Sequence, residues 1–385
     1  MDIVTNLVDQ FLNLVAPPVS FFSLCFFLPP FLLLKSFLSV LGYIFSEDVA
    51  GKVVLITGAS SGIGENLAYE YARRGDCLAL VARRQNRLRA VADNALEIGS
   101  PDVIAINGDV SKVEDCRRSV EETINHFGRC EFEFWGNYFK NLICSFCLLN
   151  SIELCTNSTF DAVDHLVNNA GIGMACMFEE SIDTTEFRNI MDTNFWGASF
   201  TTRFALPHLR DTKGKIAVLS SASWLPTPRM SIYNASKAAL RSLFETLRVE
   251  VGSDVKITIV TPGFVESELT RGKFVVRDGK VVVDPDMRDV VVSAMPVAPA
   301  AGSAKAIVDS VCRGDRYLTV PSWFRVTYHW KVSCPEVIEW VLRLFFIPSS
   351  GSPDEEALSK KIVDYTGIKN ILYPSTIQSP ELKVD

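Results

Sequence analysis

A tyrosine and a lysine lie four residues apart in SIYNASKAAL (231–240), at the expected start of a helix. One helical turn places the side chains of Tyr233 and Lys237 on the same face. A phenol ordinarily loses its proton near pH ~10, and a neighbouring ammonium group lowers that pKa by favouring the phenolate. The pair therefore predicts a proton-transfer site. The alternative is an ordinary amphipathic helix with one exposed lysine.

A glycine-rich turn connects an apolar, β-rich stretch to a helical stretch in GKVVLITGASSGIG (51–64). Such a turn lets a pyrophosphate approach the backbone at a helix N-terminus. The spacing G-x3-G-x-G differs from the G-x-G-x-x-G fingerprint, but the strand before it and the helix after it are the expected context. The candidate cofactor contacts here are Gly58, Ser60, Ser61, Gly62, Ile63 and Gly64.

Two arginines end the next apolar strand, CLALVARR (77–84). An NAD site places an acidic residue at this point for the ribose hydroxyls, whereas an arginine accommodates a 2′-phosphate. No acidic residue lies between Ala82 and Arg87. Arg83 and Arg84 therefore predict NADP(H) as the cofactor. The alternative is that these arginines only solvate the start of a helix.

Strand and helix patterns alternate along the rest of the chain. The further strand-like stretches are VIAINGDV (103–110), DHLVNNAG (164–171), GKIAVLSSAS (214–223) and KITIVTPG (256–263). This rhythm predicts an α/β fold with a doubly wound parallel sheet of the Rossmann type.

Ligands in such a fold bind beyond the carboxyl ends of the strands. The residues at these ends are Gly58, Arg83, Asp109, Asn169, Ser220 and Pro262. The helix of Tyr233 begins on the same rim. A phenol there can pass a proton while a nicotinamide passes a hydride.

The ordered motifs TGASSGIG, NNAG, YNASK and PGFVES, with Ser220 thirteen residues before YNASK, resemble the short-chain dehydrogenases/reductases over residues 51–267. The resemblance implies that Tyr233 is the acid/base and that Lys237 lowers its pKa and binds the nicotinamide ribose. It implies that Ser220 orients the substrate oxygen, with Ser221 as the adjacent alternative, and that Asn194 helps to hold a water relay. The further cofactor contacts implied are Asp109, Val110, Asn169, Ala170, Gly171, Pro262 and Gly263. No metal is implied.

The N-terminal residues 1–46 are predicted to be a membrane anchor, because 25 residues without a charge separate Asp9 from Lys35. Prolines interrupt this run at Pro17, Pro18, Pro29 and Pro30. They divide it into arms of about ten residues, each reaching only ~15 Å, that would dip into one phospholipid leaflet and return. The alternative is one kinked signal-anchor helix.

This anchor, together with ASWLPTPRMSIYNASKAAL, FETLRVE and GDRYLTVPSWFRVTY, resembles the steroleosins, which are plant oil-body dehydrogenases, over residues 1 to about 345. The resemblance implies NADP-dependent interconversion of a hydroxyl and a ketone on a sterol or steroid. It places the protein on a phospholipid monolayer of a lipid droplet or on the endoplasmic reticulum membrane, with a cytosolic catalytic domain. A homodimer is usual in that family. The alternatives are a reductase of another lipid carbonyl, such as a ketosphingoid or retinoid, and a sterol-binding protein with little turnover.

The catalytic domain is expected over residues 47–345, with a polar, exposed tail over 346–385. KFVVRDGKVVVD (273–284) predicts a hairpin that turns at Asp278-Gly279. With Met295 and the aromatic SWFRVTYHW (322–330), it could form the wall of an apolar substrate site. The alternative for these aromatics is core or membrane-facing packing.

Residues 130–163 interrupt the family pattern between HFGR and DHLVNNAG. Their Cys-x2-Cys pair could hold zinc, but a zinc site usually needs a second pair or histidines. If Cys130 is encoded by TGT and Ala162-Val163 by GCAGTG, splicing inside these codons gives HFGRLDHLVNNAG, the continuation expected in the family. We therefore interpret the segment as a retained intron.

Composition narrows the function further. The net charge of −7, with no basic stripe, argues against nucleic-acid binding. Ten cysteines, most of them scattered along the chain, are more typical of a reducing compartment than of a disulfide framework.

Overall fold

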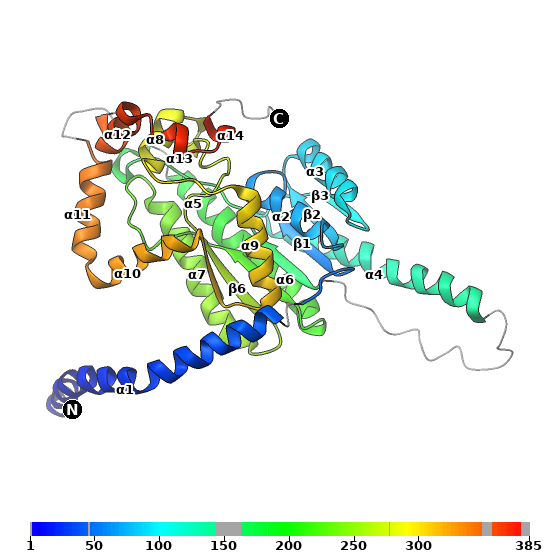
Figure 1. Ribbon diagram of the computed structural model, residues 1–385, viewed down its shortest axis with the longest axis horizontal. Coiled ribbons are helices and arrows are strands. Elements are labelled where there is room, and N and C mark those ends of the chain that lie inside the picture. Colours follow the sequence, from blue (N-terminus) through cyan, green and yellow to red (C-terminus); the bar gives the residue numbers. More distant parts are fainter. Residues whose placement is uncertain are drawn as a thin grey trace. The chain divides into compact units, whose positions relative to one another are not determined.

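The computed structural model describes residues 2–44, 47–143, 163–182, 184–276, 278–348 and 356–378. The chain divides into two compact units, Met1–Asp48 and Val49–Asp385. The first unit is built on helix α1 (Asp2–Ile44), and the second holds the sheet and all later elements (Figure 1).

Helix α1 runs through all four prolines of the N-terminal segment without a break. Its part from Gln10 to Phe37 is long and apolar enough to cross a bilayer, and none of it is buried in the protein. The predicted pair of short arms is therefore wrong. A helix keeps its remaining backbone hydrogen bonds within the segment, whereas a bend would expose more unpaired groups to lipid. The single-helix alternative agrees with the structure.

Seven parallel strands form the main sheet, in the order β3-β2-β1-β4-β5-β6-β9. They are β1 (Val53–Thr57), β2 (Cys77–Ala82), β3 (Val103–Asn107), β4 (His165–Asn168), β5 (Lys215–Leu219), β6 (Lys256–Pro262) and β9 (Tyr317–Val320). The predicted doubly wound parallel sheet is confirmed. The strand order reverses between β1 and β4, which is where ligands bind in this class of fold.

Helices cover both faces of the sheet (Figure 1). On one face lie α2 (Gly62–Ala72), α3 (Gln85–Ile98) and α9 (Ala300–Arg313); on the other lie α4 (Val113–Ile143), α6 (Gly197–Asp211) and α7 (Ser231–Val251). Alternate side chains of β1 enter the two cores, Val54 and Ile56 on one side and Val53 and Leu55 on the other. Burial on both faces explains why the strand reads as the unbroken apolar run VVLIT.

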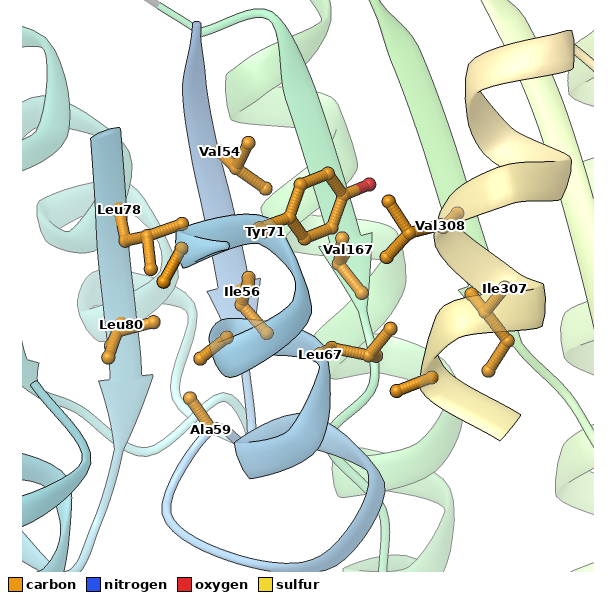
Figure 2. Packing of buried hydrophobic residues seen from close by; sticks show 14 of the residues in the cluster. Val54, Ile56, Ala59, Leu67, Tyr71, Leu78, Leu80, Val167, Ile307 and Val308 are labelled. Atoms are coloured by element: carbon orange, nitrogen blue, oxygen red, sulfur yellow. The ribbon is translucent and has the colours of Figure 1, made fainter. Parts of the chain in front are cut away.

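Figure 2 shows the first of these cores at close range. Leu67 and Tyr71 of α2 and Val308 of α9 pack over Val54 and Val167 of the sheet. These side chains are almost completely buried. This packing fixes the start of α2, and with it the glycine-rich turn, against the carboxyl end of β1.

The predicted hairpin is confirmed. Strands β7 (Lys273–Val275) and β8 (Val281–Val283) pair in antiparallel fashion, and Gly279 at the turn has a φ of +78°. Helix α8 (Pro285–Val292) follows at once, and the Asp284 carboxylate caps it by accepting a 2.8 Å hydrogen bond from the Met287 amide.

Residues 356–378 of the C-terminal tail, predicted to be polar and exposed, are folded: many of them are exposed, but a few side chains are buried. Its helices α12 (Leu358–Thr366), α13 (Lys369–Leu372) and α14 (Ser375–Gln378) gather around α8 (Figure 1). Tyr373 and Ile377 are buried against Val292 and Val297, and the Tyr373 hydroxyl donates a 2.7 Å hydrogen bond to the Ser293 carbonyl. A few buried apolar residues are enough to anchor this segment.

The remaining helices are short. They are η1 (Phe178–Glu180), α5 (Thr185–Met191), η2 (Asp192–Trp196), η3 (Ser322–Arg325), α10 (Val326–Ser333) and α11 (Pro335–Phe346). Trp330 on α10 and Trp340 on α11 are 52% and 64% exposed. Of the predicted insert, the backbone is described to Ile143 as part of α4, and residues 144–162 lie outside the described residues.

Candidate active site

A cavity of about 680 Å³ opens at the carboxyl ends of the parallel strands. Every strand-end residue expected at a binding rim lines it, namely Gly58, Arg83, Asp109, Asn169, Ser220 and Pro262. Its volume lies in the range of small-molecule and cofactor sites. The cavity also touches the start of α7, so it brings the glycine-rich turn and the Tyr233–Lys237 pair into one site.

The glycine-rich turn packs against its protein neighbours too closely to accommodate side chains at Gly58 and Gly64. Gly58 has a φ of +68°, and a Cβ on it would lie 2.7 Å from the Ala170 Cα. A Cβ on Gly64 would lie 2.3 Å from the Gly58 carbonyl oxygen. The Asn169 amide closes the turn by donating 3.0 Å hydrogen bonds to the carbonyls of Thr57 and Gly58. These residues fit a dinucleotide phosphate at the N-terminus of α2.

Gly64 differs from the other predicted cofactor contacts in this turn. It does not line the cavity but packs beneath the turn, against Gly58 and Asn169. Its role is therefore to permit the close approach of helix and strand. The other predicted contacts in the turn line the cavity, namely Gly58, Ser60, Ser61, Gly62 and Ile63.

The arginines after β2 differ in exposure. Arg84 donates hydrogen bonds from Nη2 to the hydroxyls of Ser60 (3.1 Å) and Ser61 (2.8 Å), which ties it to the glycine-rich turn. Arg83 has a side chain that is 63% exposed, with Nη1 4.0 Å from an Asp109 carboxylate oxygen. Both arginines, Asp109 and Val110 line the cavity.

Lys237 is buried, and its ammonium group donates a 2.9 Å hydrogen bond to the Leu219 carbonyl. Burial penalises the charged form and lowers the pKa of Lys237 to about 8. Gly171 lies close by, since a Cβ on it would be 3.2 Å from both Lys237 Nζ and Asn194 Oδ1. The lysine is thus enclosed at the inner end of the cavity.

Tyr233 lines the same part of the cavity and is hydrogen bonded to the side chain of Ser221. Burial raises the pKa of Tyr233, and the hydrogen bond to Ser221 offsets this in part. The expected lowering of this pKa by Lys237 is not what the structure gives. Desolvation of the phenolate dominates, and the ammonium group of Lys237 is engaged with the Leu219 carbonyl.

The two consecutive serines after β5 face different partners. The hydroxyl of Ser220 is buried and donates a 2.9 Å hydrogen bond to the Lys237 carbonyl. Ser221 is the serine hydrogen bonded to Tyr233. Successive residues of an extended chain point in opposite directions. Both serines line the cavity, so Ser220 and the alternative Ser221 both stay candidates for orienting the substrate oxygen, and Ser221 is the one beside the tyrosine.

Asn194 does not line the cavity but lies next to it, hydrogen bonded to residues of two neighbouring segments. Its carboxamide accepts a 2.8 Å hydrogen bond from the Ile172 amide and donates to the Ile172 carbonyl (2.9 Å) and the Ser236 hydroxyl (3.0 Å). It lies in η2, a π-helical turn of the kind that often occurs at functional sites. Asn194 thus joins the segment after β4 to α7, which carries Tyr233 and Lys237.

Part of the cavity lining is apolar, and sequence reasoning found little of it. Its lining includes Leu225, Met230, Phe264, Leu269, Phe274, Val275, Val281, Val291, Val292 and Phe324. The hairpin contributes as predicted. Met295 does not line the cavity, and Phe324 is the member of the aromatic segment that does. Val291 and Val292 come from the end of helix α8, and the remaining residues come from loops, where periodicity carries no signal.

No group of three or more His, Cys, Asp or Glu residues able to hold a metal ion occurs in the described part of the chain. The Cys-x2-Cys pair considered for zinc lies outside that part. The residues gathered around Tyr233 and Lys237 are thus suited to proton transfer, beside a turn that fits a dinucleotide.

Comparison with known proteins agrees with this geometry. A family profile described as short chain dehydrogenase matches residues 52–132 and 154–275, more than half of the chain. The chain belongs to the short-chain dehydrogenase family and is an oxidoreductase of that class.

Similarity to particular members extends over nearly the whole chain. "11-beta-hydroxysteroid dehydrogenase A" of Sesamum indicum is 55% identical over 99% of this chain and 100% of its own length. "11-beta-hydroxysteroid dehydrogenase 1A" of Arabidopsis thaliana is 54% identical over the same shares. The expected resemblance to the steroleosins is confirmed.

Among solved structures, a short-chain dehydrogenase/reductase of Burkholderia phymatum in complex with NAD matches with a TM-score of 0.59. It is 22% identical, and the match covers 76% of this chain and 96% of that one. At this identity the likeness supports the fold alone.

Proposed function

We propose that the protein is an NADP(H)-dependent hydroxysteroid dehydrogenase that interconverts a hydroxyl and a ketone on a sterol or steroid at a lipid surface. The observation that carries the proposal is one cavity lined by three sets of residues: the glycine-rich turn with Arg84, the Ser221–Tyr233–Lys237 group, and a set of apolar side chains. The names of the relatives support a steroid substrate. The apolar side chains of the cavity also fit a sterol skeleton.

The proposed chemistry assigns one task to each side chain. Tyr233, with its pKa raised, holds its proton at neutral pH and can donate it to a ketone oxygen. Ser221, hydrogen bonded to that phenol, holds the substrate oxygen beside it. Lys237 stabilises the phenolate left behind and is the candidate ligand of the nicotinamide ribose. The nicotinamide, when bound, supplies the hydride.

Arg84 supports the choice of NADP(H) over NAD(H). Its guanidinium lies beside Ser60 and Ser61 at the rim of the cavity, and a guanidinium recognises phosphate through paired N–H donors. Arg83 is the second candidate contact, from an exposed position.

Two features support a lipid surface. The first is the apolar helix α1, which is long enough to span a bilayer. The second is the exposed aromatic set of α10 and α11, including Trp330 and Trp340, since Trp and Tyr are favoured where a protein meets the membrane interface.

We expect Ser221→Ala to lower kcat by about a hundredfold, in line with the loss of one donor to a developing oxyanion. Ser220→Ala is the matched control. It removes a buried hydrogen bond to the Lys237 carbonyl, at a cost of about 1 kcal/mol of stability. Its kcat should stay within about threefold of wild type. Steady-state kinetics and thermal unfolding of both variants test this assignment, and a larger loss of kcat in Ser220→Ala would reverse it.

We also propose that residues 130–163 are a retained intron. A chain in which one leucine replaces them should fold, bind NADP(H) with unchanged affinity and aggregate less, because the insert is rich in apolar residues. Val163, at the distal junction, is fully buried and so lies where the leucine would be accommodated. Light scattering and cofactor titration of the two chains provide the test. An unfolded short chain would contradict the proposal, as would a mature transcript that keeps the insert.

The substrate class is tested by following nicotinamide absorbance with full-length protein in liposomes. Hydroxysteroids form one set of candidate substrates, and ketosphingoid and retinoid compounds form the other. We expect turnover with at least one hydroxysteroid. Turnover confined to the second set would overturn the steroid assignment and leave the catalytic group intact.

A further inference from the structure

Three cationic side chains converge on one carboxylate at the rim of the cavity. Glu268 accepts hydrogen bonds through Oε1 from the Nη1 atoms of Arg84 and Arg87, the latter at 2.8 Å, and through Oε2 from Lys273 Nζ at 3.2 Å. Its side chain is 20% exposed. Glu268 follows β6 on the segment that leads to the hairpin, whereas Arg84 and Arg87 follow β2, so the contact joins two segments that line the cavity.

This carboxylate binds the same guanidinium that the proposed function assigns to a phosphate. Arg84 spans two groups, since Nη1 contacts Glu268 while Nη2 donates to Ser60 and Ser61. Carboxylates and phosphates are bound by guanidinium groups in the same forked, charge-assisted manner. Desolvation by burial raises the pKa of Glu268, but the hydrogen bonds and charges of Arg84 and Lys273 together outweigh it and hold the pKa below its ordinary value, so the group is anionic at neutral pH.

The charges at this rim match a phosphate better than they match the carboxylate. Among the contacts of the described residues, the single carboxylate of Glu268 meets three cationic side chains, whereas a phosphate monoester brings about −1.5 to −2 charges and three acceptor oxygens at neutral pH. A phosphate arriving at Arg84 therefore gains from the cations and is repelled by Glu268. Arg87 and Lys273 can keep the Glu268 carboxylate in place when Arg84 binds the phosphate instead.

We propose that Glu268 is a specificity-determining residue that competes with the cofactor's 2′-phosphate for Arg84 and thereby limits the preference for NADP(H) over NAD(H). This rests on the proposed function, because it takes Arg84 to be the phosphate ligand. Glu268 also links the two ends of the site. Its neighbours Ser267 and Leu269 line the cavity, so displacement of its carboxylate from Arg84 frees one attachment of the substrate wall.

The test is a calorimetric titration of the full-length protein with NADP⁺ and with NAD⁺, which measures the Kd of each cofactor. Glu268→Gln removes the competing charge and retains the shape of the side chain. We expect its Kd for NADP⁺ to fall about tenfold, which corresponds to one charge-assisted contact, and its Kd for NAD⁺ to stay within twofold of wild type. NAD⁺ lacks the 2′-phosphate and shares the remaining contacts, so its unchanged affinity also shows that the site is folded.

Glu266→Gln is the matched control, because Glu266 is a carboxylate on the same segment but contacts Arg271 and Thr376. It should leave both affinities unchanged. An unchanged NADP⁺ affinity in Glu268→Gln would overturn the inference. A weakened NAD⁺ affinity in that variant would do so as well, because it would make Glu268 a ribose ligand or a purely structural residue.

Arg84→Gln separates this inference from the proposed function. If it weakens NADP⁺ binding selectively while Glu268→Gln has no effect, the cofactor assignment stands and the competition fails. If Arg84→Gln affects NADP⁺ and NAD⁺ equally, the cofactor assignment itself fails. A titration with 2′,5′-ADP and ADP, which lack the nicotinamide, should reproduce the same differences between the variants.

Discussion

Replacing Tyr233 by phenylalanine is expected to lower kcat by about a thousandfold and to leave the affinity for NADP(H) unchanged. In the proposed chemistry the phenol, which lines the cavity beside Ser221, is the proton donor, and positioned proton transfer contributes about 10²–10⁴ to a rate. Phenylalanine keeps the ring and its packing and removes only the hydroxyl. Steady-state kinetics with a hydroxysteroid and cofactor titration together separate chemistry from binding.

Tyr317→Phe is the matched control for this change. It also removes one phenolic hydroxyl, but that hydroxyl contacts Glu245 on the outside of the protein. Its kcat should equal that of wild type. A Tyr233→Phe enzyme that retained more than a tenth of wild-type kcat would remove Tyr233 from the proton-transfer role.

Replacing Lys237 by methionine is expected to abolish turnover and, at the same time, to stabilise the protein. Burial lowers the pKa of Lys237 from its ordinary 10.5 to about 8, so folding costs free energy as long as the lysine is protonated. The difference corresponds to about 3 kcal/mol at most. Methionine fills a similar volume without the charge. A substitution that raises stability while it removes activity is expected where a functional residue destabilises the fold.

The pH dependence of this effect has a definite sign. Below pH 8 the lysine is protonated in both states, so the full penalty is present in the wild type. Between about pH 8 and 10.5 the unfolded state binds more protons than the folded state, so the contribution of this lysine to stability rises with pH. The stability advantage of Lys237→Met should therefore be largest at pH 7 and should shrink as the pH approaches 10.

Urea unfolding at pH 7, 8, 9 and 10 measures this difference. Lys112→Met controls for the loss of one positive charge, because Lys112 is exposed on the surface. A Lys237→Met protein that is less stable than wild type at pH 7 would show that the hydrogen bond to the Leu219 carbonyl outweighs the desolvation of the ammonium group.

The sheet and the location of the site could be predicted because their signals are local and periodic. Doubly buried strands such as VVLIT read as apolar runs, and their carboxyl ends fall at the rim wherever the strands are parallel. The glycine-rich turn directly follows β1, and Tyr233 and Lys237 lie at the start of the helix that follows β5. Because the carboxyl ends of parallel strands meet at one edge of the sheet, the glycine-rich turn, Tyr233 and Lys237 are brought together around one cavity.

The features that sequence missed depend on orientation or on distant packing. The different partners of Ser220 and Ser221 depend on the direction in which each side chain leaves the end of β5, which spacing alone does not specify. The fold of the tail depends on Tyr373 and Ile377 meeting α8 from far along the chain. The contact between Glu268 and Arg84 joins residues 184 positions apart. No short-range pattern encodes contacts of this kind.

The most direct measurement of the central claim is the rate at which the full-length protein in liposomes reduces NADP⁺ and NAD⁺ with a hydroxysteroid as hydride donor. We expect turnover with both NADP⁺ and the steroid present, a higher kcat/KM for NADP⁺ than for NAD⁺, and loss of turnover in Tyr233→Phe. Absence of turnover with either cofactor, or turnover that survives in Tyr233→Phe, would contradict the assignment of this cavity as a hydroxysteroid dehydrogenase site.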